Sequence, residues 1–139
     1  MDERELMTYK LSKREIKFRA WDKKRKKMIF LKKLLPALED RYILMQYTGL
    51  KDKKREEIYE GDILRYKPYH NLGYENEYKI GVVEWGETGD SDDYCHSHHY
   101  EWVVNDDSLA DIADGVYEGF ECEVIGNIFE NPELLNNND

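Results

Sequence analysis

Short stretches of β-forming residues, separated by turns at close intervals, make up most of this 139-residue chain. Residues 16–21 alternate apolar and charged side chains, which is the period of a half-buried strand. The all-charged segment 22–27 predicts a turn, and residues 28–31 predict the partner strand of a hairpin. No helical periodicity recurs along the chain. The pattern therefore favours a small barrel or roll over a βαβ sheet.

The remaining elements follow from the same residue patterns. Further strands are predicted at residues 42–48, 58–59, 63–66, 78–85, 94–104 and 121–129. Gly49 is expected to end its strand, residues 86–93 to form a turn, and residues 106–114 one or two helical turns. Asn131 and Pro132 fit the cap and first residue of a short final helix. The predicted fold class is mainly β, with minor α.

A glycine and an aspartate lie next to each other in the middle of the chain, in a pattern that is typical of a tight turn. Gly61 suits a tight bend or bulge, and Asp62 can accept hydrogen bonds from backbone N–H groups next to it. Together with other glycines and one proline they are predicted to determine the fold; the set is Gly49, Gly61, Asp62, Gly81, Gly126 and Pro132.

Charge is strongly segregated along the chain. Residues 1–33 carry 13 Lys and Arg against 5 Asp and Glu, whereas residues 68–139 carry 18 acids and one basic residue. Residues 34–67 carry equal numbers of acidic and basic residues, and the total is -9. The 32 Leu, Ile, Val and Phe residues are enough for a modest core, to which 11 Tyr and three Trp add amphipathic rings.

The chain has no sequence features of a membrane or secreted protein. No apolar run approaches the roughly 20 residues that cross a bilayer, and the charged start, residues 1–5, is not a signal peptide. Cys95 and Cys122 show no metal-type spacing, so reduced thiols in the cytoplasm are the simplest interpretation. A Cys95–Cys122 disulfide is the alternative.

Four blocks of sequence, in order, resemble a known family. They are Ile16–Asp22 with Met28; Met45–Asp52 followed by Glu57–Ile63; Gly81–Trp85; and Glu123–Leu135. In these blocks the chain resembles the YopX family of bacteriophage and prophage proteins. It departs from the family at residues 54–55, where Lys-Arg replaces the usual Asn-Gly, so that turn is expected to differ or be looser.

The resemblance implies a small N-terminal β-hairpin region followed by an SH3-like β-barrel. The corresponding domains are residues 1–44, a basic region with the hairpin, and residues 45–135, the barrel, with a disordered tail at 136–139. It also implies a phage or prophage origin, in the cytoplasm of a bacterial host cell. It implies no reaction and no cofactor.

A histidine-rich segment is the sharpest local candidate for chemistry. Residues 95–99 read Cys-His-Ser-His-His, and on a strand His96 and His98 project from one face. With Asp92 they could share a transition metal, although a second ligand pair is missing. Because neighbouring strand residues point to opposite faces, Cys95 and His96 do not form a nucleophile dyad. We predict that the protein is not an enzyme.

Charged surfaces are the remaining candidates. The basic run at residues 23–27, with Lys32 and Lys33, could bind phosphates, with Trp21 and Phe30 stacking beside it. This predicts weak nucleic-acid binding as one alternative. The main hypothesis is a non-catalytic module that binds a protein partner or its own copies, because the chain carries complementary charges. The predicted surface consists of Trp21, Lys23, Lys24, Arg25, Lys26, Lys27, Asp90, Asp92 and Asp93.

Overall fold

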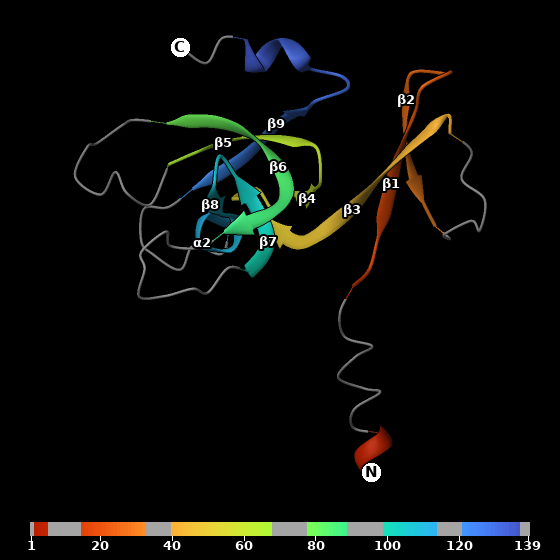
Figure 1. Cartoon of the computed structure of the whole chain (residues 1–139), viewed down its shortest axis with the longest axis vertical. Coiled ribbons are helices and arrows are strands. Elements are labelled where there is room, and N and C mark those ends of the chain that lie inside the picture. Colours follow the sequence, from red (N-terminus) through yellow and green to blue (C-terminus); the bar gives the residue numbers. More distant parts are fainter. Residues whose placement is uncertain are drawn as a thin grey trace.

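The computed structural model describes residues 2–5, 15–32, 40–67, 78–88, 99–113 and 121–136. Strands dominate these residues, so the mainly β prediction is confirmed (Figure 1). The elements, in chain order, are β1 (Phe18–Asp22), β2 (Lys27–Leu31), β3 (Tyr42–Lys51), β4 (Glu57–Tyr59), β5 (Asp62–Tyr66), β6 (Lys79–Thr88), β7 (His99–Val104), β8 (Asp107–Ser108), α2 (Leu109–Ala113), β9 (Cys122–Asn127) and the 3-10 helix η2 (Pro132–Leu135).

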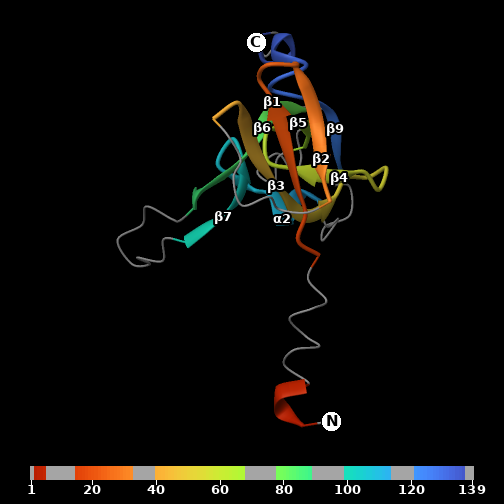
Figure 2. The same cartoon turned by 90° about the vertical axis from the view of Figure 1, so that its right-hand side faces the viewer.

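The first sheet has the strand order β2-β1-β3-β4 and contains the predicted hairpin. β1 and β2 pair antiparallel, with Phe18 opposite Leu31 and Asp22 opposite Lys27. β1 also pairs antiparallel with β3, which places Trp21 opposite Ile43. β2 therefore forms one edge of this sheet. Figure 2 shows the hairpin and β3 facing the viewer.

The second sheet has the strand order β8-β7-β6-β5-β9, and every pairing in it is antiparallel. β6 is long and strongly curved, so the sheet wraps around its own core (Figure 1). That the curved sheet is an SH3-like barrel stays a prediction. The predicted boundary between residues 44 and 45 falls inside β3, which leads from the hairpin to the second sheet.

The turn between β4 and β5 joins the two sheets. Gly61 has a φ of +86°, which L side chains rarely adopt, and this bears out the predicted tight bend. Its N–H donates to the carbonyl of Val83 at 2.9 Å, and its carbonyl accepts from the N–H of Ile128 at 3.0 Å. Asp62 accepts from the N–H of Tyr59 at 2.8 Å, as predicted.

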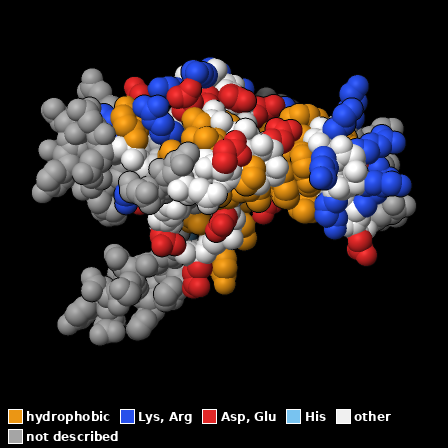
Figure 3. All heavy atoms as spheres, turned by 90° about the horizontal axis from the view of Figure 1, so that it is seen from above, with side chains coloured by type: hydrophobic (Ala, Val, Ile, Leu, Met, Phe, Trp, Pro, Cys, Tyr) orange, Lys and Arg blue, Asp and Glu red, His pale blue; other side chains and the backbone are white. Residues whose placement is uncertain are grey.

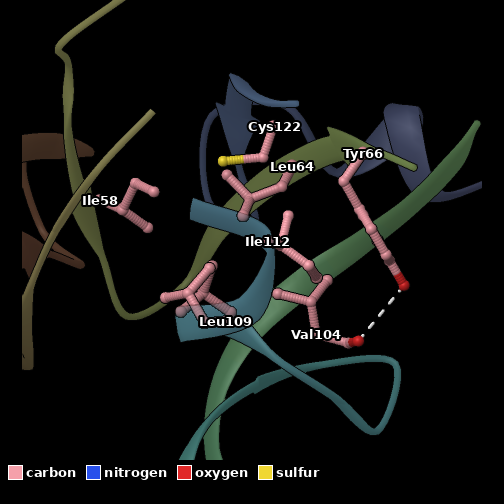
Figure 4. Close-up of a cluster of buried hydrophobic side chains, with 8 residues drawn as sticks. Ile58, Leu64, Tyr66, Val104, Leu109, Ile112 and Cys122 are labelled. Carbon is pink, nitrogen blue, oxygen red and sulfur yellow. Dashed lines mark hydrogen bonds between the residues drawn. The ribbon is translucent and has the colours of Figure 1, made fainter. Parts of the chain in front are cut away.

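The hydrophobic core lies between the curved sheet and α2 (Figure 4). Its buried members are Ile58, Leu64, Tyr66, Val83, Val104, Leu109, Ile112 and Cys122. The Tyr66 hydroxyl donates to the carbonyl of Val104 at 3.3 Å and accepts from Asn105 at 3.1 Å, so its polar end is satisfied.

Several element boundaries differ from the predictions. Gly49 does not end its strand, because a bulge between Tyr47 and Lys51 accommodates its φ of +86° and β3 continues. Gly86 lies within β6 and not in a turn. The strand needs a glycine here because a Cβ at this position would come within 2.9 Å of the Val103 side chain. The predicted helix at 106–114 begins only at Leu109, after β8.

The C-terminal segment differs in two details. β9 ends at Asn127, so the last two residues of the predicted strand 121–129 lie in a turn. Pro132 does open a short helix, but Asn131 does not cap it with its side chain. The Asn131 side chain instead accepts from the N–H of Asn127 at 3.3 Å and fills the space beside Gly126.

Some predictions fall outside the described residues. These are the start of the strand predicted at 94–104, most of the turn at 86–93 and the last three residues of the predicted tail. Within the described ranges, no helix has both the length and the apolar character needed to span a membrane.

Candidate functional site

The tip of the β1–β2 hairpin, residues 23–27, is a basic turn that is built without glycine. The buried carboxylate of Asp22 holds it, because one oxygen accepts from the N–H groups of Lys24 and Arg25 at 3.0 and 3.2 Å. The other oxygen pairs with Arg41 at 2.7 Å. Lys26 adopts a left-handed φ of 54° to close the turn. The five side chains of the basic turn therefore stand on a fixed backbone.

All five side chains of the basic turn are exposed. Within the described ranges, no ion pair joins any of them to an acid. In Figure 3, one end of the molecule carries mostly Lys and Arg beyond a hydrophobic band, while the rest of this face carries Asp and Glu together with further Lys and Arg. The basic turn therefore lies apart from most of the acids, whereas Lys53 and Lys54 in the body of the molecule pair with Glu121 and Glu123.

Trp21, the aromatic residue predicted to act beside the basic turn, already has a partner. Its ring stacks on Phe129 with centroids 5.2 Å apart and an angle of 14° between the planes. The other predicted stacking residue, Phe30, is largely exposed and meets Tyr59 edge-on at 5.9 Å. Trp21 thus connects the hairpin to the turn after β9 and has at most one free face.

An apolar groove of about 320 Å³ lies where the two sheets meet. β3, the β4–β5 turn, β6 and the turn after β9 supply its lining: Ile43, Leu44, Met45, Glu60, Gly61, Val82, Val83, Glu84, Trp85, Ile128 and Phe129. Trp85 is 54% exposed, and its ring is held by an edge-on contact to Trp102 at 5.0 Å. The groove presents a fixed indole to solvent.

A second hollow, the polar cleft, has a volume of about 470 Å³ and lies between β2 and β9. Its lining includes the buried ion pair of Arg19 on β1 and Asp62 on β5, which are 2.8 Å apart. Arg19 also donates to the carbonyl of Glu60 at 3.1 Å and lies over the Tyr59 ring at 4.8 Å. The Nε of Arg19 is buried without a hydrogen-bond partner among the described residues.

The pKa values of two aspartates shift in opposite directions. Burial raises the pKa of Asp62 to about 6, and the nearby Arg19 offsets only part of that cost. The hydrogen bond from Arg41 lowers the pKa of Asp22 to about 2. Asp62 is thus a buried carboxyl with a structural partner, whereas Asp22 is fully ionised at neutral pH and holds the basic turn.

All of the predicted metal and acidic candidates lie outside the described residues. These are His96, His98, Asp90, Asp92, Asp93 and also Cys95. His99 is described, and its ring meets the carboxylate of Glu101 at 2.5 Å. Among the described residues no cluster of three His, Cys, Asp or Glu is placed to hold a metal. Cys122 is a free, buried thiol whose pKa burial raises to about 12.

Sequence reasoning did not find the apolar groove. Trp85 lies two residues from buried Val83 on the same strand, so strand alternation alone gives no sign that its side chain is exposed. β6 continues beyond the core, and this leaves Trp85 exposed at the junction of the sheets. The run of apolar residues at 43–45 was a signal, but the groove depends on the meeting of four segments of the chain.

Fold and surfaces together define a small mainly β protein with an apolar groove between two sheets and a basic hairpin tip. A family model described as "YopX protein" matches residues 36–136, and the chain belongs to that family. The crystal structure of protein EF1440 from Enterococcus faecalis is similar, with a TM-score of 0.55 and 28% sequence identity. That match covers 87% of this chain and 98% of EF1440. No curated protein matches the sequence.

Proposed function

We propose that this YopX-family protein is a non-catalytic module that binds a protein partner in the apolar groove. The observation that carries the proposal is Trp85, a large aromatic side chain held half-exposed in a groove of apolar neighbours. Trp is enriched among the residues that dominate binding energy at protein interfaces, especially in pockets that exclude water. A prearranged ring also loses little conformational freedom on binding.

The chemistry of the described residues supports a non-catalytic role. The high pKa of the Cys122 thiol makes it a poor nucleophile, and it lies in the core. The raised pKa of Asp62 is explained by its burial, and its pairing with Arg19 across the two sheets gives it a structural role. We infer in addition, from the family, that the protein acts in the cytoplasm of a bacterial host cell in phage or prophage biology.

Replacing the groove tryptophan tests the proposal. A tagged protein would be used to capture partners from bacterial host cells, with wild type, Trp85→Ala and Tyr100→Ala compared. Tyr100 on β7 is the matched control, because it is an aromatic residue with 63% exposure outside the groove lining. Trp85→Ala should lower capture of a specific partner by about tenfold or more. Equal capture by the two variants, both shown to be folded by circular dichroism, would contradict the proposal.

Weak nucleic-acid binding through the basic turn is the second candidate. The observation that favours it is five exposed cations on a fixed backbone, without ion pairs in the described part of the chain. Such binding should fall steeply with salt, because each phosphate contact releases counterions. Titrating a fluorescent single-stranded oligonucleotide at increasing salt checks this. Absent or salt-insensitive binding rules the candidate out.

A further inference from the structure

The charges around the apolar groove indicate the kind of group that it accepts. Its lining contains two carboxylates, Glu60 and Glu84, and no Lys or Arg. Glu84 and Trp85 are consecutive exposed residues of β6, and both line the groove. A groove that offers both an exposed indole and carboxylates favours a cation on an aliphatic stem, since the cation interacts with the ring while the stem covers apolar surface.

The basic turn of the same chain is a group of this kind. Its five side chains are all Lys or Arg, all are exposed, and the described residues pair none of them with an acid. The turn is also fixed in its own molecule, because Asp22 is bonded to Arg41 and the N–H of Lys23 donates to the carbonyl of Arg41 at 2.8 Å. Its exposed side chains are therefore available to contact another molecule.

We propose that the apolar groove of one copy binds the basic turn of a second copy of this chain. The inference rests on the proposed function and names the partner of the same groove. Cations of the turn lie over Trp85 and beside Glu84, and their stems cover Ile43 and Leu44, both of which are partly exposed. Contacts between exposed charges are individually weak and are screened by salt, so self-association should weaken as ionic strength rises.

The basic turn and the apolar groove are different surfaces. A variant with a blocked groove should therefore still bind, through its basic turn, to a variant whose turn is blocked but whose groove is intact. Glu84→Lys places a cation in the groove, and the pair Lys24→Glu and Arg25→Glu reverses the turn. The bonds that shape the turn use the backbone N–H groups of residues 24 and 25, so the reversal leaves them in place. Asp111→Lys on α2 and Lys79→Glu on β6 are the matched controls, both at exposed positions outside turn and groove.

Sedimentation velocity over a concentration series at low salt measures the outcome. Wild type and both controls should self-associate, each blocked variant alone should be monomeric, and an equimolar mixture of the two blocked variants should form a one-to-one dimer. Dimer formation only on mixing is not expected of a variant that has merely misfolded. Failure of the mixture to associate, or a wild type that stays monomeric at every concentration, overturns the proposal.

A synthetic peptide that copies residues 21–28 separates this proposal from the proposed function. If wild type stays monomeric but the peptide binds and Trp85→Ala removes that binding, the second copy is excluded and a basic segment of another protein fills the groove. If capture of other proteins is equal for Trp85→Ala and Tyr100→Ala while the blocked variants still complement each other, the groove serves self-association alone.

Discussion

The two sheets of this protein are stabilised in different ways. The second sheet encloses an apolar core, in which residues such as Leu64 and Ile112 are fully buried. The first sheet depends to a greater extent on buried charges: Arg19 on β1 pairs with Asp62, and Asp22 at the end of β1 pairs with Arg41. Apolar packing tolerates small shifts, whereas buried ion pairs require fixed geometry. The buried pair of Arg19 and Asp62 therefore helps to fix the orientation of the basic hairpin, together with the stack of Trp21 on Phe129.

The largest effect is expected from breaking the ion pair between the sheets. Arg19→Met leaves the Asp62 carboxylate buried without its partner, which should cost about 3 kcal/mol of unfolding free energy. Urea denaturation followed by circular dichroism measures it. Adding Asp62→Asn removes the stranded charge, so the double variant should be more stable than Arg19→Met alone. A double variant less stable than Arg19→Met would show that the two residues do not act as a pair.

The dependence of stability on pH should differ between the two aspartates. The pKa of Asp22 falls from 3.8 to about 2 on folding, so its contribution to stability is present above pH 4 and lost as pH falls towards 2. The pKa of Asp62 rises from 3.8 to about 6, so its contribution is greatest below pH 4 and is lost as pH rises through 6.

Thermal denaturation of wild type, Asp22→Asn and Asp62→Asn between pH 2.5 and 7 tests these opposite slopes. Asp22→Asn should lower the melting temperature at pH 7 and lose most of that difference by pH 2.5. Asp62→Asn should show less loss of stability than wild type between pH 4 and 7. Parallel curves for all three proteins would contradict the assigned pKa shifts.

The smallest effect should be a gain, in the turn between β3 and β4. Arg55 has a left-handed φ of 70°, which is strained for any residue with a Cβ and relaxed for glycine. Arg55→Gly should therefore add up to about 1 kcal/mol of stability, read from the urea midpoint. Arg55→Ala keeps the strain and is the control. A loss on Arg55→Gly as large as that on Arg55→Ala would show that strain does not matter here.

This turn also shows what the sequence could and could not predict. The replacement of Asn-Gly by Lys54 and Arg55 suggested a different or looser turn, but the turn is well bonded. One carboxylate oxygen of Asp52 accepts hydrogen bonds from the N–H groups of Lys54 and Glu56 at 2.8 and 2.9 Å. The other oxygen accepts a hydrogen bond from the N–H of Val124 at 3.0 Å. Two of these bonds are local, but the bond to Val124 spans 72 residues and has no sequence signal.

Local features were therefore predictable, and contacts between distant segments were not. The hairpin, the bend at Gly61 and the acceptor role of Asp62 follow from neighbouring residues. The pairing of Arg19 with Asp62 depends on how two sheets meet, as does the apolar groove. Of the predicted binding residues, the basic turn is exposed as expected, whereas Trp21 is occupied by its stack on Phe129.

β3 connects the hairpin region mechanically to the rest of the molecule. Its first residues pair with β1 in the hairpin region, and its last residues pair with β4 beside the curved sheet. A strand shared in this way transmits a tilt of the hairpin directly to the turn that leads into β5. Cutting the chain before residue 45 would divide this strand and leave its remaining half without its neighbour β1. The hairpin and the curved sheet should therefore melt in one transition.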